Sequence, residues 1–121
     1  MNALPPYAAL LGVIVEGEKL IMPFAPAVEG RPAFVHGGAL AGLLEIAGRR
    51  ALEAALAGQG TPDLLTSTTE FWRGGRERDT RPTAEVARLG NRIAQVRASA
   101  WQEAPDQPIA VAQLTFRVSR P

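Results

Sequence analysis

Residues 36–58, HGGALAGLLEIAGRRALEAALAG, are the stretch of sequence that decides the fold. From Gly38 to about Ala57, leucine and alanine recur at spacings of three and four residues, which predicts one long helix with Gly58 at its C-cap. At 1.5 Å per residue the helix is about 30 Å long. Apolar side chains wrap most of its circumference, so we expect it to be covered on more than one side.

The sequence before this helix predicts a hairpin followed by a loop. From Leu10 to Pro26, short apolar runs flank Gly17, a residue that easily takes a positive φ in a tight turn. Residues 23–35 contain three prolines and a glycine, which interrupt both helices and strands. We therefore expect two strands and then an irregular segment that leads into the helix.

The sequence after the helix is strand-like throughout. In the last two segments apolar and polar residues alternate, as in strands with one buried face. Gly90-Asn91 predicts a two-residue hairpin turn, and residues 104–108 predict a longer one. The expected strands are Leu64–Arg73, Thr83–Leu89, Arg92–Gln102 and Ile109–Ser119.

These elements predict an α+β fold in which a curved antiparallel sheet wraps one long central helix. The chain has 121 residues, enough for one domain, and we assign residues 1–121 to it. Because the helix is apolar on extra faces and the outer surface of the sheet must also be accounted for, we expect a homo-oligomer, with a two-fold dimer as the commonest closed form.

Composition excludes several classes of function. With 46% hydrophobic and 21% charged residues, the chain is typical of a folded domain. It has no cysteine and one histidine, which exclude disulfides, thiolate metal sites, a cysteine nucleophile and a multi-histidine metal site. The net charge of +1 suggests neither nucleic-acid nor membrane binding. The first ten residues lack the basic-then-apolar order of a signal peptide, so we expect a cytoplasmic protein.

The tripeptide His36-Gly37-Gly38 is the first candidate site. The free backbone amides of a helix's first turn point back at this loop, and the positive end of the helix dipole favours an oxygen that gains negative charge. Two glycines would let an acyl carbonyl approach these amides closely. The same residues are also compatible with a purely structural turn.

Glu45 is the second candidate. At 3.6 residues per turn it falls beside Ala41, Gly48 and Leu52 and not on a charged face. A carboxylate among small and apolar groups would be a better base near neutral pH if it were partly desolvated. The alternative is an exposed i, i+4 ion pair with Arg49, which would stabilise the helix by only about 0.3–0.5 kcal/mol.

These motifs resemble the hotdog-fold acyl-CoA thioesterases of the phenylacetate-degradation type. The most specific feature is His36-Gly37-Gly38 followed by an acid nine residues after the histidine, on a long helix rich in alanine and leucine. The segments 70–75, EFWRGG, and 86–94, VARLGNRIA, resemble that family's third-strand exit and next hairpin. The resemblance covers residue 10 to the C-terminus and implies the hotdog fold.

The resemblance also implies roles for single residues. The amide that polarises the thioester carbonyl falls on Gly37, and we expect the Gly37 and Gly38 amides together to hold the carbonyl oxygen. The catalytic carboxylate falls on Glu45 and is supplied by the other subunit. The acid acts as a general base on water or as a nucleophile that forms an anhydride. His36 chiefly shapes the loop, and a lone histidine beside a turn is in any case more often structural. No metal or redox cofactor is implied, and coenzyme A enters only as part of the substrate.

This chain departs from the family pattern at two places. Relatives often carry an asparagine or glutamine six residues before the histidine, where this chain has Gly30. Some relatives have a serine on the third strand that orients the attacking water. The corresponding residue here is Leu64, with Thr66 and Thr68 as candidate helpers on the same face.

Several arginines are candidates for binding the phosphates of coenzyme A, because guanidinium groups make bidentate contacts with phosphate. They are also explained as solvated strand ends. The candidates are Arg73, Arg76, Arg78, Arg88 and Arg92.

The resemblance predicts an acyl-CoA thioesterase that works as a homodimer or a dimer of dimers. A non-catalytic acyl-CoA-binding protein is one alternative, because Gly30 and Leu64 replace helper residues. A hotdog dehydratase or hydratase acting on acyl thioesters is another, and it would depend on His36 as base.

Overall fold

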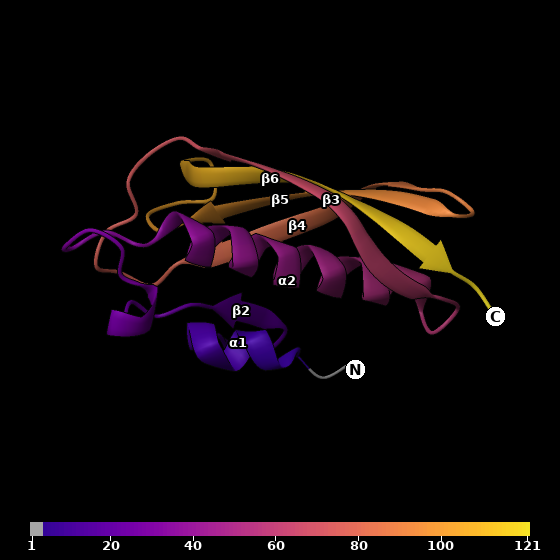
Figure 1. The fold of residues 1–121 in the computed structure, drawn as a ribbon, viewed down its shortest axis with the longest axis horizontal. Helices are drawn as coiled ribbons and strands as arrows, with labels where there is room; N and C mark the ends of the chain where they lie inside the picture. The colour runs from indigo at the N-terminus through magenta and orange to yellow at the C-terminus, as the bar shows by residue number, and fades with distance from the viewer. Residues whose placement is uncertain (1–3) are drawn as a thin grey trace.

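The computed structural model describes residues 4–121 and places one long helix against a curved antiparallel sheet (Figure 1). Its elements in chain order are α1 (Pro6–Leu11), β1 (Ile14–Glu16), β2 (Lys19–Ile21), a 3₁₀ turn (Pro26–Val28), α2 (Gly37–Leu56), β3 (Thr61–Phe71), β4 (Arg81–Leu89), β5 (Ile93–Trp101) and β6 (Pro108–Ser119). The predicted α+β architecture is confirmed.

The long helix α2 begins one residue earlier than predicted, with His36 as its N-cap. It ends at Leu56, and Ala57 takes the left-handed conformation at the C-cap, φ 49°, which we had assigned to Gly58. Gly58 follows with φ 82°, so both residues turn the chain toward β3. Within residues 4–121, no helix, α2 included, is both long and apolar enough to cross a membrane.

The four main strands form one antiparallel sheet in the order β3-β6-β5-β4. Alternation along β5 and β6 was predicted correctly, since every second residue of each strand is buried. Many of these inward residues are alanines, which let the helix approach the sheet closely. The buried set is Ala94, Val96, Ala98, Ala100, Ala110, Ala112, Leu114, Phe116 and Val118.

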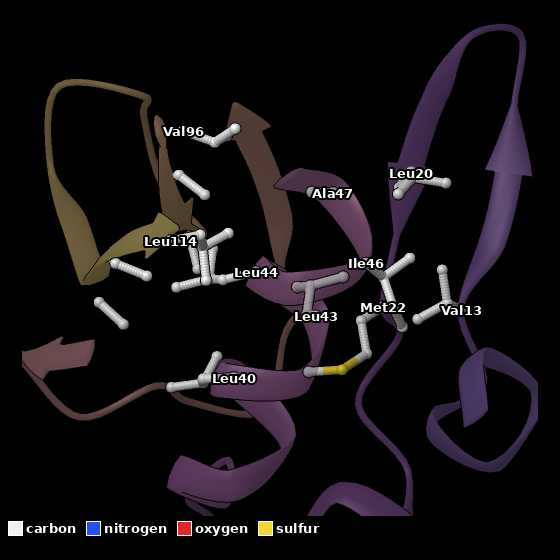
Figure 2. Close-up of a cluster of buried hydrophobic side chains, with 14 of the residues drawn as sticks. Val13, Leu20, Met22, Leu40, Leu43, Leu44, Ile46, Ala47, Val96 and Leu114 are labelled. Atoms are coloured by element: carbon white, nitrogen blue, oxygen red, sulfur yellow. The ribbon is translucent and has the colours of Figure 1, made fainter. Parts of the chain in front are cut away.

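The opposite side of α2 is covered by the N-terminal segment, as its extra apolar faces required. In Figure 1, α1 and β2 lie on one side of α2 and the four-stranded sheet lies on the other. Figure 2 shows Leu44 directed toward Leu114 of the sheet, whereas Ile46 is directed toward Val13 and Leu20. The core therefore occupies both sides of the helix.

The predicted hairpin is present as β1 and β2, with Gly17 at φ 66°. Helix α1 was not predicted, although Pro6 stands at its first position and Gly12 at its C-cap. A proline at that position does not disturb a helix, because the N–H that it lacks would have no partner there. The two prolines therefore start a helix and do not prevent one.

Several strand boundaries in the sheet differ from prediction by one to three residues. Strand β3 begins at Thr61 and includes Pro62, which an edge strand tolerates because one side of it needs no ladder bonds. The tight turn between β4 and β5 lies one residue later than predicted, at Asn91 and Arg92. There Gly90 N–H donates to the Ile93 carbonyl at 2.9 Å.

Candidate functional site

The start of α2 presents one free backbone donor. The Gly38 N–H donates to Nδ1 of His36 at 2.8 Å, so this amide is already used and does not serve as the second oxyanion donor that we expected. The next two amides, of Ala39 and Leu40, donate to the His36 carbonyl. Within residues 4–121, the Gly37 N–H alone in this first turn has no acceptor. It lies at the positive end of a 20-residue helix.

The loop before the helix is held firmly in place. The His36 N–H donates to the Val28 carbonyl at 2.7 Å, and the Val35 N–H donates to the Gly75 carbonyl at 2.9 Å. Gly30 lies directly against His36, since a Cβ at position 30 would be 3.2 Å from the His36 Cα. The larger amide side chain that relatives carry here would therefore require His36 to shift.

Glu45 lies on a stripe of α2 that faces the edge strand β3. The stripe consists of Gly37, Ala41, Glu45 and Arg49, four residues apart and all partly exposed. Both ends of the stripe are next to β3: a Cβ at Gly37 would be 3.3 Å from the Phe71 ring, and Arg49 Nη1 donates to the Pro62 carbonyl at 2.7 Å. Glu45 therefore lies between two contacts with β3.

The alternative ion pair between Glu45 and Arg49 does not form. The Arg49 guanidinium instead lies 5.8 Å from the centre of the Phe116 ring and binds the β3 backbone. Within residues 4–121, the half-buried Glu45 carboxylate has no ion pair and no hydrogen bond. A carboxylate in this state can accept a proton or approach an electrophilic carbon.

The two candidate groups of one protomer are separated along the helix. Glu45 follows Gly37 by eight positions in the helix, which corresponds to about 12 Å of rise. Reacting atoms must approach to about 3–3.5 Å. One protomer alone therefore does not bring the free amide and this carboxylate to the same carbon.

The register of β3 corrects the assignment of its helper residues. The pairing with β6 shifts between Leu64 and Thr66, so Leu65 is an extra residue and the side chains after it change faces. Thr66 and Thr68 pair with Thr115 and Gln113, whose side chains point away from α2. They therefore lie on the face opposite to Glu45.

Ser67 and Thr69 occupy the helix-facing side of β3 and were missed. They pair with the buried Leu114 and Ala112, and Leu114 packs against Gly48, three residues after Glu45. The bulge explains why they were missed. If side chains are assumed to alternate strictly from Leu64 onward, every residue after the bulge is assigned to the wrong face of the strand.

The arginines predicted to bind phosphates do not form one group. Arg73 follows β3 near the start of α2, and its N–H donates to the Ile109 carbonyl. Arg88 and Arg92 lie at the other end of the sheet, where the Arg92 carbonyl accepts from Val118 near the end of β6. Within one protomer, Arg73 cannot share a phosphate with these two residues.

Two wide hollows lie away from this stripe. One, of about 980 Å³, lies between β2, β4 and the small residues on the far side of α2. The other, of about 550 Å³, lies on the outer face of the sheet and includes Thr68 and Trp72. In the described part of the chain, no three histidine, aspartate or glutamate residues gather in a way that could hold a metal ion.

Solved structures share this fold along nearly the whole chain. AziG from S. sahachiroi has a TM-score of 0.84 at 17% identity, covering 98% of this chain and 100% of its own. A phenylacetic acid degradation-related protein from Ralstonia eutropha has a TM-score of 0.82 at 21% identity, covering 96% and 92%. The BH2602 protein from Bacillus halodurans, solved with CoA, has a TM-score of 0.79 at 22% identity, covering 92% and 76%.

The sequence itself identifies the family. No curated protein matches the chain significantly. The family model described as the acyl-CoA thioesterase N-terminal domain, however, matches residues 28–117. This range includes the loop before α2, the whole of α2 and the sheet almost to its last residue. The chain therefore belongs to the acyl-CoA thioesterase family and has its hotdog fold.

Proposed function

We propose that the protein hydrolyses an acyl-CoA thioester to the free acid and coenzyme A. The observation that supports this proposal is that one stripe of α2 presents both a free Gly37 N–H and a free, half-buried Glu45 carboxylate. An N–H at a helix start stabilises an oxygen that gains negative charge, and a free carboxylate activates water or attacks a carbonyl. Family membership supports the same chemistry.

The proposed reaction uses these two groups in order. The thioester oxygen accepts a hydrogen bond from Gly37 N–H, which polarises the carbonyl carbon. Water attacks this carbon while Glu45 takes a proton from the water. The C–S bond then breaks, and Glu45 passes this proton to the departing thiolate. If Glu45 attacks the carbon itself, the C–S bond breaks, the thiolate leaves and an anhydride forms; water then hydrolyses the anhydride, which regenerates the Glu45 carboxylate and supplies the proton that the thiolate takes up. Both routes give the acid and the thiol.

The proposed site is shared between two protomers. Ala41 lies midway between Gly37 and Glu45 on the stripe. A two-fold axis near Ala41 would therefore bring Gly37 of each protomer against Glu45 of the other, and both sites would form in the same contact. Small residues at positions 37 and 41 would allow the two helices to approach closely.

The edge strand β3 supports such a dimer. It has 11 residues and, among the strands of residues 4–121, pairs only with β6, so its other edge is open. Leu65, Phe71 and Trp72 on and just after this strand are 51%, 55% and 56% exposed. A long open edge with exposed apolar side chains promotes association, and it borders the stripe that carries Glu45.

The helix cap makes a dehydratase that depends on His36 a weaker alternative. Nδ1 of His36 accepts from Gly38 N–H, so this nitrogen is used to form the helix start. Nε2 of His36 would be the remaining ring nitrogen that could act as the base. In this structure the ring caps the first turn of α2, which begins at Gly37.

Release of free thiol from aryl and aliphatic acyl-CoA substrates tests the proposal. We expect turnover by the native chain and a loss of about 100- to 10,000-fold in Glu45→Gln, because a general base contributes on this scale. Glu53→Gln, two turns further along α2 in the hollow beside β2 and β4, is the matched control and should keep its activity.

Two outcomes would contradict the proposal. A native chain that binds acyl-CoA and releases no thiol from any substrate would be a binding protein. A Glu45→Gln variant with native turnover would remove this residue from the mechanism. Circular dichroism and size-exclusion chromatography of the variant show whether a loss of activity reflects chemistry and not folding.

A further inference from the structure

Two arginine side chains stack on the two faces of one aromatic ring near the start of α2. The guanidinium carbon of Arg31 lies 4.2 Å from the centre of the Phe34 ring, and that of Arg76 lies 4.4 Å from it. Two guanidinium groups cannot share one face at such distances, so they occupy opposite faces. Stacking on aromatic rings uses the flat faces of the guanidinium groups and leaves their N–H edges available.

The turn that carries Arg31 and Phe34 is tightly built. The Phe34 N–H donates to the Arg31 carbonyl at 3.0 Å, and Ala33 between them has φ 70°, which is strained for a residue with a Cβ. Oε2 of Glu29 accepts from the Ala33 N–H at 2.8 Å and fixes the strained residue. Such strain persists only where the surroundings hold it, and it is common at functional sites.

The loop that carries Arg76 is fixed just as firmly. The Gln102 side chain accepts from the Arg76 N–H at 2.8 Å and donates to the Arg76 carbonyl at 3.0 Å. Gln102 also donates to the Arg78 carbonyl and to Thr80 Oγ1. Both arginines therefore extend from backbone that is already ordered, which lowers the entropic cost of binding a ligand.

These two cations also lack acidic partners. Within residues 4–121, neither Arg31 nor Arg76 forms an ion pair. Arg78, Arg97 and Arg117, in contrast, pair with Glu103, Glu85 and Asp63. Two unpaired positive charges on one ring repel each other in the absence of a ligand and suit a ligand that carries more than one negative charge.

The pair stands next to the loop that presents the Gly37 amide. Gly30, the neighbour of Arg31, lies against His36, and Val35, the neighbour of Phe34, donates to the Gly75 carbonyl beside Arg76. We propose that Arg31 and Arg76, held by Phe34, bind the phosphate groups of coenzyme A. This inference rests on the proposed function and names residues that would bind the nucleotide end of its substrate.

Calorimetric titration with coenzyme A and with pantetheine, which lacks the nucleotide and all phosphates, tests the proposal without turnover. Charge-assisted hydrogen bonds to phosphate are strong, but exposed sites weaken them, so we expect Arg31→Gln and Arg76→Gln each to weaken coenzyme A binding about three- to tenfold. Pantetheine binding should not change. Phe34→Leu keeps both charges and should produce part of the same loss, because it removes the platform.

Arg97→Gln is the matched control, since Arg97 is an exposed arginine paired with Glu85 in the middle of the sheet. It should bind coenzyme A like the native chain. Native affinity for coenzyme A in the Arg31→Gln, Arg76→Gln double variant would overturn the proposal, and so would an equal loss for coenzyme A and pantetheine. The native chain could hydrolyse no acyl-CoA while the double variant still loses affinity for coenzyme A. In that case the binding site stands and only the proposed function is rejected.

Discussion

The backbone N–H of Gly37 differs from its neighbours because nothing within residues 4–121 accepts from it. His36 supplies its ring nitrogen to the next amide and its carbonyl to the two after that. The sequence predicted that this glycine pair presents amides at a helix start. It could not predict that one of the two is already used, because this depends on the rotamer of the His36 side chain.

Removing only this N–H tests its role at the residue scale. Gly37 is the first residue of α2 and follows an extended His36, φ −66° and ψ 135°, so Gly37→Pro suits the backbone and removes the donor. Losing one oxyanion donor costs about 100- to 1000-fold in turnover. We expect this loss in kcat for Gly37→Pro, measured by thiol release.

Gly37→Ala is the matched control for this change. It keeps the N–H and adds a Cβ that would lie 3.3 Å from the half-exposed Phe71 ring, which can move slightly. We expect it to retain most of the native kcat. Equal activity of the proline and alanine variants would show that the Gly37 N–H does not act in the reaction.

At the scale of elements, helix α2 and the alternation of β5 and β6 were predictable from apolar spacing alone, since β5 and β6 each bury one face and α2 repeats leucine and alanine every three or four residues. The bulge in β3 was not, because Leu64, Leu65 and Thr66 fit a regular strand equally well. Helix α1 was missed for a related reason: its two prolines read as a break, and only packing against α2 makes six residues helical. Local patterns predict the elements, and tertiary contacts decide these exceptions.

The corrected register of β3 makes a prediction about its hydroxyl groups. Ser67 lies on the helix-facing side, near the turn of α2 that carries Glu45, whereas Thr66 lies on the outer face. If Ser67 orients the attacking water, Ser67→Ala should lower kcat about tenfold, the value of one hydrogen bond of about 1.4 kcal/mol. Thr66→Ala should leave kcat unchanged. The reverse pattern in thiol-release assays would reject the register.

Two glycines inside α2 predict effects of different size on stability. A Cβ at Gly48 would lie 2.3 Å from Cδ1 of Leu114, which is 1% exposed and has no room to move. We expect Gly48→Ala to lower the free energy of unfolding by about 1–3 kcal/mol through overpacking. A Cβ at Gly42 would overlap the Tyr7 ring, but Tyr7 is 45% exposed and its ring can turn away, so Gly42→Ala should lower the free energy of unfolding by less than about 1 kcal/mol. Urea unfolding of both variants measures the difference.

At the scale of the whole molecule, the residues of the proposed site and an open sheet edge lie on the same side of the chain. The sequence predicted an oligomer from the excess of apolar faces on α2, but the N-terminal segment covers part of that excess. The open edge of β3 and the separation of Gly37 from Glu45 now support the dimer. The separation follows from the sequence, whereas the open edge was not visible before the order of the strands was known.

A charge on the edge strand tests the proposed dimer. Leu65 is the extra residue of the bulge and half exposed, so Leu65→Arg should leave the folded protomer intact. Buried in an interface, the arginine would be costly, and the dimer should dissociate at micromolar concentration with loss of turnover. Sedimentation velocity measures the state, with Leu10→Arg on the exposed face of α1 as control. An unchanged dimer would place the interface elsewhere.

Mixing two inactive variants tests the central claim most directly. Glu45→Gln retains the Gly37 amide, and Gly37→Pro retains the Glu45 carboxylate. If the groups act across the interface, half of the dimers after random exchange are mixed and one of their two sites is intact, so an equal mixture should recover about a quarter of native turnover. If both groups act within one protomer, every site in the mixture is defective, and activity that stays at the level of the separate variants would contradict the account.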